Sequence, residues 1–534
     1  MIVLGLWDGH DAGAALVAGG RLVCAISEER LSRVKRASGF PTRAIRAVLD
    51  DAGVQGHEVT HVALAGRAGR LPQRVLDSLY GSSSPDRDPL AWSSTVARLL
   101  DNHVAKSPAL ASLEAAAWRP LVRSRLEAHG LGGANLCLVD HHDAHAATAG
   151  LVTTSEGAAL VTMDGYGDGD AATFRQSGRV TRLRSPGASL ALIYGATTRL
   201  LGFREGDEGK VTGLAARGDP GRLGAAFRAV TAPGACAPSL SPELRAAIRS
   251  APREDVAAAV QTVVEERALE LFRQHVVGSP PLAVAGGLFA NVALNQRIAQ
   301  RYPALSVFPA MGDAGLCVGA AVVVAGPVPF GVPFLGPEPA SSEVEAAVKA
   351  CGLPAVGVGR PEWHLADAIL RGATVARVVG RSEFGPRALG HRSILMLADD
   401  ASRLETLNRA LARDDFMPFA PIRRGGAGTA TMTQLFEADA ALRERCPAVV
   451  HVDGTVRTQR LDAAADPALA ELLQRTEAAG HPALVNTSFN LHGEPIVESA
   501  VDALRTFERA GLDLMQLSGW LVAREARWLP GNEG

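Results

Sequence analysis

The chain has 534 residues, of which 47% are hydrophobic and 21% charged, and its formal net charge is −2. This length exceeds what one hydrophobic core can serve, so we expect two or three domains. The nearly balanced charge gives no electrostatic basis for duplex nucleic acid or an anionic membrane as the main partner.

The N-terminal residues 1–7 are typical of a β-strand and lack the charged flank and long apolar stretch of a signal peptide. No uncharged apolar run approaches the length that spans a bilayer. The six cysteines are scattered without a Cys-x-x-Cys pair, which excludes a zinc ribbon or a redox pair and favours reduced thiols. We therefore expect a cytoplasmic protein.

Two stretches of the chain share one strand plan. Each has a strand, a loop containing Asp-Gly, a second strand, a turn containing glycine, and a third strand. The strands are expected at residues 2–7, 14–17 and 21–26, and again at 158–163, 171–176 and 179–183. Such a repeat is typical of the actin-like ATPase superfold, in which two ribonuclease-H-like halves close on a nucleotide. The predicted fold class is therefore mixed α/β.

A short apolar strand before Asp140 passes into an alanine-rich helix that carries two histidines. His141 and His145 are spaced i and i+4, which places both imidazoles on one helix face, one turn apart. Asp164 and Asp313 each stand where an apolar strand meets a Gly-rich turn, so their carboxylates are expected in a cleft. This set suits a first-row divalent metal with positions left open for substrate. For the histidine pair alone, a polar helix start capped by Asp140 is the alternative.

Two Gly-rich stretches are candidates for nucleotide binding. The segment 202–218 is charged, and Glu208 and Lys210 are its candidates for a phosphate or ribose contact, with a solvated turn as the alternative. Further along, Gly286-Gly287 follows an apolar strand and precedes a helix. Glycine there lets the backbone approach a nucleotide, and Asn291 can bind a hydroxyl or a base edge.

Two other stretches organise the domains. Residues 66–130 are an Ala-, Arg- and Leu-rich insertion, expected as helices around a loop that serves either as packing or as a lid over a second substrate. Residues 327–339 contain five prolines, which predicts a stiff linker. We therefore expect a first domain at 1–330, a linker at 331–360 and a second domain at 361–534.

The second domain begins with a strand that runs into a loop rich in arginine and glycine. Arg381, Arg387 and Arg392, with Ser393 beside them, can form an anion cradle, because guanidinium groups bind phosphate oxygens in pairs. A surface charge cluster is the alternative. Near the C-terminus a strand ends in a polar turn that can complete a polyphosphate site, and its candidates are Asn486, Thr487, Ser488 and Asn490.

Seven motifs occur in one order along the chain. They are His141-x-x-x-His145, Asp164-Gly-x-Gly, Glu208-Gly-Lys210, Gly286-Gly287 with Asn291, Gly312-Asp313, Glu383-Phe-Gly-Pro-Arg-Ala-Leu-Gly-x-Arg-Ser393 and Asn486-Thr-Ser-Phe-Asn490. This series resembles the family of nodulation-protein and antibiotic O-carbamoyltransferases, which includes the tobramycin-modifying type. The resemblance covers nearly the whole chain.

The resemblance implies two catalytic units. The C-terminal domain would have a YrdC-like fold and join carbamoyl phosphate to ATP with Mg²⁺, releasing pyrophosphate and making carbamoyl adenylate. The N-terminal domain would resemble the tRNA threonylcarbamoyl-transfer protein and hold an iron(II) ion or another divalent metal. It would pass the carbamoyl group to a hydroxyl of a small molecule, such as an antibiotic or another natural product.

The resemblance also implies roles for individual residues. The metal ligands would be His141, His145, Asp164 and Asp313. The adenylate in the transfer domain would be held by Gly165, Glu208, Lys210, Gly286, Gly287 and Asn291. Carbamoyl phosphate and ATP would be held by Arg387, Arg392, Ser393, Arg413, Asn486, Thr487, Ser488 and Asn490. His10 would be the general base, with Lys35 as a basic residue beside it.

The chain departs from the family at one anion contact. Where many relatives have a lysine, this chain has Leu411-Ala-Arg413, and Asp414-Asp415 then add negative charge. The rival functions are an actin-like sugar kinase, carbamoylation of tRNA and a nucleotide-dependent assembly protein without transfer activity. The sequence identifies neither the acceptor nor whether the protein is a monomer or a homodimer.

Overall fold

The computed structural model describes residues 1–67, 108–184, 189–232, 240–413 and 419–531. The chain forms two compact units, which consist of Met1–Ala25 with Ser38–Phe330 and of Ile26–Ala37 with Gly331–Gly534. The second unit therefore includes a short segment that the sequence placed in the first domain. No helix in the described ranges is long and apolar enough to cross a membrane.

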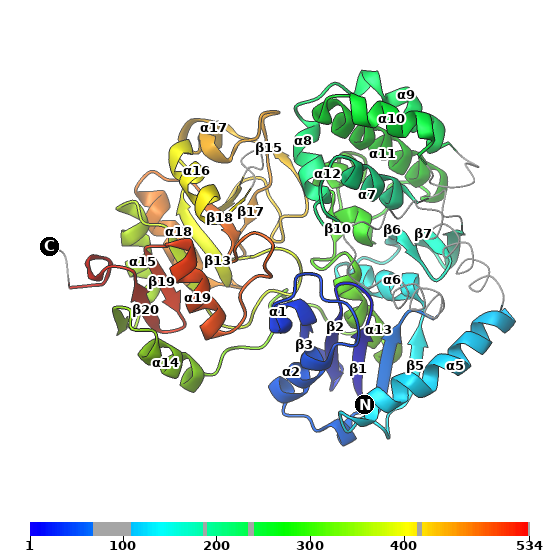
Figure 1. Cartoon of the computed structure of the whole chain (residues 1–534), viewed down its shortest axis with the longest axis horizontal. Helices are drawn as coiled ribbons and strands as arrows, with labels where there is room; N and C mark the ends of the chain where they lie inside the picture. The colour runs from blue at the N-terminus through cyan, green and yellow to red at the C-terminus, as the bar shows by residue number, and fades with distance from the viewer. Residues whose placement is uncertain (68–107, 185–188, 233–239, 414–418, 532–534) are drawn as a thin grey trace. The chain divides into compact units, whose positions relative to one another are not determined.

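The first unit contains two five-stranded sheets with the same strand order, and several of their strands are labelled in Figure 1. One sheet has the order β3-β2-β1-β4-β5 and comprises β1 (Ile2–Trp7), β2 (Gly13–Ala18), β3 (Arg21–Ser27), β4 (His61–Ala65) and β5 (Asn135–Val139). The other has the order β8-β7-β6-β9-β10 and comprises β6 (Ala159–Gly167), β7 (Asp170–Gln176), β8 (Arg179–Leu183), β9 (Leu282–Ala285) and β10 (Leu305–Val307).

Strand directions repeat as well as strand order. β1 pairs antiparallel with β2 and parallel with β4, and β6 pairs antiparallel with β7 and parallel with β9. The predicted duplicated ribonuclease-H/actin-like fold is therefore confirmed. The central strands are apolar runs with buried side chains, as expected for strands covered on both faces.

Two helices join the sheets of this unit. Helix α6 (His141–Leu151) packs on β6 and β9, and helix α13 (Leu316–Ala325) packs on β1, β2 and β4. The two helices also pack against each other. Their buried faces consist largely of small residues, which allows close approach of the two backbones. Helix α6 begins at the candidate ligand His141, and α13 follows directly on a short 3-10 turn that begins at Asp313, so this packing brings candidate ligands together.

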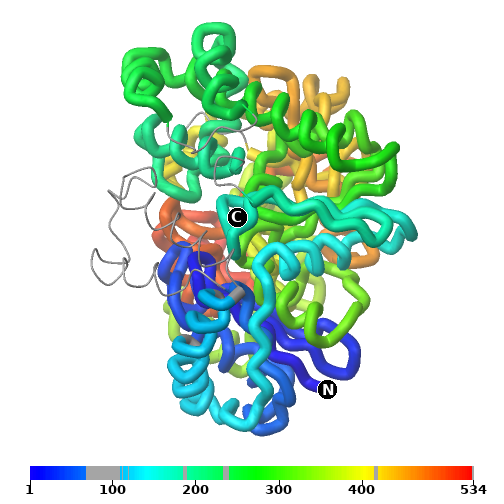
Figure 2. Tube along the Cα trace, turned by 90° about the vertical axis from the view of Figure 1, so that its right-hand side faces the viewer, coloured from blue at the N-terminus to red at the C-terminus, as the bar shows by residue number. Residues whose placement is uncertain are grey.

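The remaining helices of the first unit flank the two sheets. They are α2 (Thr42–Ala52), α5 (Pro108–Glu127), α7 (Leu190–Leu200), α8 (Glu208–Ala215), α9 (Gly224–Val230), α10 (Pro242–Ser250), α11 (Arg253–His275) and α12 (Val292–Arg301). Helix α11 contacts α7, α8, α9 and α12, and this helical group is seen in both views (Figures 1 and 2). Of the predicted insertion at 66–130, residues 68–107 lie outside the described residues.

The second unit is built on a mixed eight-stranded sheet with the order β11-β20-β19-β12-β13-β18-β14-β17. Its strands are β11 (Ala355–Gly357), β12 (Val375–Val378), β13 (Arg392–Leu397), β14 (Ala420–Arg423), β17 (Gln459–Arg460), β18 (Leu484–Ser488), β19 (Leu514–Leu517) and β20 (Trp520–Ala523). A separate pair consists of β15 (Phe436–Glu437) and β16 (Thr455–Val456).

Helices cover both faces of this sheet. Helices α15 (Pro361–Leu370) and α18 (Pro467–Ala478) enclose one apolar core, while α14 (Ser341–Ala350) and α19 (Ala500–Ala510) belong to the other. The shorter or peripheral helices are α1 (Glu28–Ser32), α16 (Ala401–Ala410) and α17 (Ala440–Arg445). The unit is thus a three-layer α/β structure.

The predicted linker at 331–360 differs from the structure, because these residues belong to the second unit. Helix α14 and the edge strand β11 both lie within them. The proline-rich stretch itself pairs with the unit: the N–H of Phe384 donates to the carbonyl of Pro333 at 2.7 Å, and the N–H of Gly336 donates to that of Ser382 at 3.0 Å. Proline lacks an N–H but keeps its carbonyl, so a proline-rich stretch can still line a loop.

Candidate functional site

Four side chains converge at the N-terminal ends of α6 and α13. Nε2 of His141 lies 3.1 Å from Oδ2 of Asp164 and 3.6 Å from Oδ1 of Asp313, and Nε2 of His145 lies 3.4 Å from Oδ1 of Asp313. One potential ligand atom from each residue lies within 4.8 Å of the others. The structure therefore brings together all four residues that the sequence predicted as metal ligands.

The chemistry of this cluster fits a divalent cation. His145 is completely buried, and neither of its ring nitrogens has a hydrogen-bond partner in the described part of the chain. A buried imidazole without such a partner is rare unless a ligand or ion completes it. Burial opposes the charged form of His141, but the carboxylates of Asp313 and Asp164 raise its pKa to about 9. Negative charge thus dominates the cluster and would favour a cation.

Local backbone geometry orients the carboxylate of Asp164 in this cluster. Asp164 lies where the register between β6 and β7 shifts, and such an irregularity redirects side chains from a strand. Gly286 has φ +114°, and a Cβ there would lie 2.2 Å from the carbonyl oxygen of Met163. Glycine is therefore required for the next residue, Gly287, to donate its N–H to Oδ1 of Asp164 at 2.8 Å.

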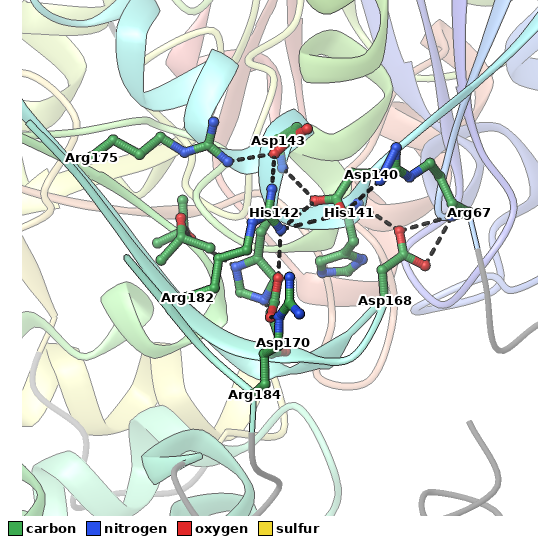
Figure 3. A network of polar contacts seen from close by, with 12 residues as sticks. Arg67, Asp140, His141, His142, Asp143, Asp168, Asp170, Arg175, Arg182 and Arg184 are labelled. Atoms are coloured by element: carbon green, nitrogen blue, oxygen red, sulfur yellow. Dashed lines mark hydrogen bonds and ion pairs between the residues drawn. The ribbon is translucent and has the colours of Figure 1, made fainter. Parts of the chain in front are cut away.

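An acidic and basic network supports the start of α6 (Figure 3). Asp140 caps the helix by accepting the N–H of Asp143. The guanidinium of Arg182 binds Asp143 at 2.6 Å, Asp170 at 2.5 Å and Asp140 at 3.3 Å. The carboxylate of Asp168 accepts the backbone N–H of His141 at 2.8 Å. The predicted Asp140 cap and the metal cluster are thus both present, although the sequence offered them as alternatives.

Both ring nitrogens of His142 lie within hydrogen-bond distance of other residues of the first unit. Its Nδ1 lies 2.7 Å from Oγ1 of Thr162, and its Nε2 lies 3.0 Å from the carbonyl oxygen of Asp170. Burial and the neighbouring imidazoles of His141 and His145 lower its pKa to about 3. His142 is therefore a neutral packing residue beside the cluster rather than a ligand.

His10 lies on the loop between β1 and β2, beside the metal cluster. Its Nε2 is 3.3 Å from Oδ2 of Asp313, and its side chain is about half exposed. The loop is fixed by Trp7, whose Nε1 donates to the carbonyl of His10 at 2.7 Å. Lys35 lies in the segment that belongs to the second unit, where its Nζ is 3.6 Å from Glu29. Its predicted place beside His10 stays a prediction.

The predicted nucleotide residues of the first unit fall into two groups. Gly165 lies on β6 and Gly287 at Asp164, next to the metal cluster. Glu208 is the first residue of α8, and Lys210 binds Asp207 at 3.0 Å.

Asn291 has a role that the sequence did not suggest. It caps α12 by accepting the N–H of Leu294, and its amide exchanges two hydrogen bonds with Gln261 at 2.8 and 3.1 Å. The side chain is almost fully buried. To bind a hydroxyl or a base edge as predicted, Asn291 would have to give up hydrogen bonds to Gln261 or Leu294.

In the second unit, three arginines, Arg387, Arg413 and Arg457, lie close enough together for the charges of Arg387 and Arg413 to act on Arg457. Nε of Arg457 is buried without a hydrogen-bond partner among the described residues, and burial alone, with no ion pair or side-chain hydrogen bond, lowers the pKa of the Arg387 guanidinium. Burial, together with the charges of Arg387 and Arg413, lowers the pKa of Arg457 far below its usual value. Because a guanidinium does not deprotonate in proteins, this repulsion stays until an anion relieves it.

Arg413 is positioned by two contacts. Its Nη1 donates to Oγ1 of Thr487, and its guanidinium lies over the ring of Phe419, 4.6 Å from the centroid. Ser488 follows Thr487 at the end of β18, and Asn490 bonds internally to the carbonyls of Leu491 and Glu494 at 2.9 Å. Asp414 and Asp415 lie outside the described residues.

Three of the predicted anion ligands form hydrogen bonds within the second unit. Arg392 is completely buried, and its guanidinium donates to the carbonyls of Val379, Gly380 and His391. Oγ of Ser393, also buried, accepts the N–H of Gly390 at 2.9 Å. Both side chains thus have partners within the unit, and their predicted contact with carbamoyl phosphate or ATP stays a prediction.

The amide of Asn486 belongs to the same interior. It donates to the carbonyl of Ala388 at 3.1 Å and to Oε1 of Gln459 at 2.5 Å, and the side chain is 2% exposed. Arg457 is the site residue that the sequence reasoning missed. Its segment carries no glycine-rich or arginine-rich pattern, so only proximity to Arg387 and Arg413 identifies it.

The fold and the two sites define a protein with a metal-type centre in an actin-like unit and an anion-type centre in a second α/β unit. The family model described as "Carbamoyltransferase N-terminus" matches residues 3–233 and 239–322, and "Carbamoyltransferase C-terminus" matches residues 366–524. The chain belongs to this carbamoyltransferase family, within the O-carbamoyltransferase branch predicted from the sequence.

Several curated proteins are similar over most of the chain. Nodulation protein NolNO of Sinorhizobium fredii is 29% identical over 96% of this chain and 79% of its own length. Nodulation protein NolO of Bradyrhizobium diazoefficiens is 31% identical over 72% of this chain and 79% of its own length. The 3'-hydroxymethylcephem-O-carbamoyltransferase of Amycolatopsis lactamdurans is 27% identical over 96% of this chain and 98% of its own length.

Among solved structures, the activator of the 2-hydroxyisocaproyl-CoA dehydratase from Clostridium difficile aligns with a TM-score of 0.36 and 13% identity. The alignment covers 61% of this chain and 94% of that chain. The fold assignment rests on the strand order of the two sheets and not on this likeness.

Proposed function

We propose that the protein is an ATP-dependent O-carbamoyltransferase that uses carbamoyl phosphate as donor and a small-molecule hydroxyl as acceptor. The observation that carries the proposal is the cluster of Arg387, Arg413 and Arg457 in the region matched by the family's C-terminal model. Arg387 and Arg457 have no internal partner among the described residues, so the cluster favours a polyanion such as the phosphates of these two substrates.

In the second unit, the reaction would make carbamoyl adenylate. Water releases inorganic phosphate from carbamoyl phosphate, and an oxygen of the resulting carbamate attacks the α-phosphorus of ATP while pyrophosphate leaves. Both substrates are anions, so Arg387, Arg413 and Arg457, with Mg²⁺ on the nucleotide, would reduce their repulsion and stabilise charge in the transition state. Thr487 and Ser488 would add hydrogen bonds at the end of β18.

In the first unit, the carbamoyl group would pass to the acceptor. A divalent metal such as iron(II), held by His141, His145, Asp164 and Asp313, would supply Lewis acidity toward the carbamoyl oxygen. His10 would accept the hydroxyl proton as the hydroxyl oxygen bonds to the carbamoyl carbon and AMP leaves. Asp313 lies within 3.3 Å of Nε2 of His10 and would orient the imidazole.

The acceptor class follows from the relatives. The name of the Amycolatopsis lactamdurans relative gives a hydroxymethyl group as its acceptor, and we infer a hydroxyl of an antibiotic or other natural product here. The net charge of −2 disfavours tRNA as the acceptor. Because ATP and carbamoyl phosphate are cytoplasmic metabolites, we place the reaction in the cytoplasm.

The decisive experiment measures pyrophosphate release by the full-length protein under anaerobic conditions with Mg²⁺ and iron(II), without an acceptor. We expect release that requires both ATP and carbamoyl phosphate, accompanied by one inorganic phosphate per pyrophosphate. Absence of release with every divalent metal tested would contradict adenylate formation and favour a nucleotide-dependent assembly protein. Release without phosphate would contradict the proposed stoichiometry.

A further inference from the structure

The loop between β12 and β13 carries Arg387 and is held from inside by a carboxylate. Oε1 of Glu383 accepts the backbone N–H groups of Leu389 at 2.7 Å, His391 at 2.8 Å and Arg392 at 3.1 Å. Glu383 is 3% exposed, so water does not compete for these bonds. The carboxylate therefore fixes the C-terminal half of the loop.

The N-terminal half of the same loop is held by Arg30 of α1. Nη2 of Arg30 lies 3.3 Å from the carbonyl oxygen of Glu383 and 3.2 Å from that of Gly385. Both carbonyls precede Arg387 in the loop, and Arg30 is only 4% exposed. Arg30 and Glu383 together hold the loop on both sides of Arg387.

The segment around α1 also holds the second loop of the anion site. Nη1 of Arg33 donates to the carbonyl of Ile496 at 2.7 Å, and Nη2 donates to that of Pro495 at 2.8 Å. These carbonyls follow the polar turn that ends with Asn490. A segment from the N-terminal part of the sequence thus binds both the loop that carries Arg387 and the loop that follows Asn490.

Charge compensation accounts for part of this arrangement. Two buried carboxylates, Glu383 and Glu498, share their surroundings with the buried guanidinium groups of Arg30 and Arg392. A lysine at position 30 would preserve the charge balance. Both carbonyl bonds come from one nitrogen, Nη2, which the rigid guanidinium holds in place, whereas a lysine ammonium lies at the end of a flexible four-carbon stem.

We propose that Arg30 is a positioning residue for the anion site: by binding the carbonyls of Glu383 and Gly385, it sets the loop that presents Arg387. This inference rests on the proposed function, because the ligand of Arg387 is there assigned as carbamoyl phosphate or ATP. Residues 26–37, which also carry Lys35, are then an integral part of the adenylate-forming unit.

The test compares Arg30→Lys with Arg445→Lys in the full-length protein. Arg445 also donates to a carbonyl of the second unit, that of Gly480 at 3.1 Å, but it is exposed and outside both loops. Initial rates of pyrophosphate release are measured against carbamoyl phosphate concentration, and amide hydrogen exchange is followed over residues 383–392. We expect Arg30→Lys to raise KM for carbamoyl phosphate about tenfold, with little change in kcat and with faster exchange in the loop.

The control Arg445→Lys should leave KM and loop exchange unchanged. A KM for Arg30→Lys within twofold of the unaltered protein, with unchanged loop exchange, would overturn the proposal. If Arg30→Lys does not fold, Arg30→Gln takes its place, because it removes the guanidinium but keeps an amide donor. An unchanged KM in that variant would likewise overturn the proposal.

Failure of the proposed function can be separated from failure of this inference. If the unaltered protein releases no pyrophosphate, binding of inorganic pyrophosphate is measured by calorimetry as a probe of the arginine cluster. Binding about tenfold weaker in Arg30→Lys than in Arg445→Lys would still support the positioning role. Equal dissociation constants in the two variants would overturn it.

Discussion

The two candidate centres are built on opposite principles of charge. In the first unit, His141 and His145 meet the carboxylates of Asp164 and Asp313 at 3.1 to 3.6 Å. In the second unit, the positive charges of Arg387 and Arg413 act on the buried guanidinium of Arg457 and repel it. The charge of the first cluster thus suits a cation, and the charge of the second suits an anion.

The contrast also appears within the second unit, between arginines that stabilise the fold and arginines that remain without partners. Arg377 binds the carboxylate of Asp466 through two bonds, at 2.6 and 3.0 Å. Arg392 donates to three backbone carbonyls. Arg387 and Arg457 make no such bonds with described residues. Burial alone does not distinguish these two groups of arginines, whereas their hydrogen-bond and ion-pair partners do.

The first test of the difference between the two centres is His10→Asn. We expect transfer to fall by about 100-fold or more, because a general base is lost, while pyrophosphate release from the second unit persists. The two activities are measured separately, as carbamoylated product and as pyrophosphate. Transfer at the unaltered rate would remove His10 from the mechanism.

Arg457→Met should have the next largest effect. Unlike His10→Asn, it should impair the reaction of the second unit. We expect pyrophosphate release to fall by about 100-fold, because a charged contact to the anions is lost. Thermal stability should stay equal or rise, since one of three repelling charges is removed. Enzyme assays and calorimetry are the measurements. A large loss of stability would indicate a structural arginine.

Asp466→Asn should show what loss of a structural partner does. We expect a destabilisation of about 3 kcal/mol at neutral pH, because Arg377 keeps its charge without a counterion. Although burial opposes the charged carboxylate, His391 and Arg377 hold the pKa of Asp466 well below the ordinary 3.8.

The stabilisation by Asp466 therefore depends on pH. A depressed pKa in the folded state means that the contribution is complete above about pH 5 and is lost as the pH falls through the acidic range. Urea unfolding at pH 7 and pH 3.5 should show a larger difference between unaltered protein and variant at pH 7. An equal difference at both values would contradict the assigned ion pair.

Lys210→Met should have the smallest effect. Its ammonium already binds Asp207 at 3.0 Å, so an adenylate contact would replace an internal one and contribute little net affinity. We expect about a fivefold change in transfer and none in pyrophosphate release. Parallel assays of both activities would check this, and an equal loss in both would contradict a role confined to the first unit.

Several features could be predicted from local sequence because they depend on local geometry. The spacing of His141 and His145 placed both on one helix face. Alternating apolar strands and turns indicated the two repeats of three strands. The residues predicted as metal ligands come from three segments that the duplicated fold brings together. The order of motifs in the chain was sufficient to predict this set of ligands, because each motif lies at the end of a strand or near the start of a helix of the repeat.

Other assignments needed the folded structure, because residue type does not reveal which partners a side chain meets. Arg392 and Ser393 stand in the same motif as Arg387, yet they lie inside the sheet and bond to the backbone. Arg457 lies outside the arginine-rich motif but joins Arg387 through the fold.

The composition of the second unit likewise depended on tertiary contacts. Residues 26–37 precede most of the first unit in the chain, and nothing in their local pattern shows that Arg30 and Arg33 bind loops more than 300 positions away. The repeat, the motifs and the sign of charge at each centre were already evident from the amino-acid sequence. Which of those charges have partners within the protein became evident only from the folded chain, because long-range packing selects the partners of each buried group.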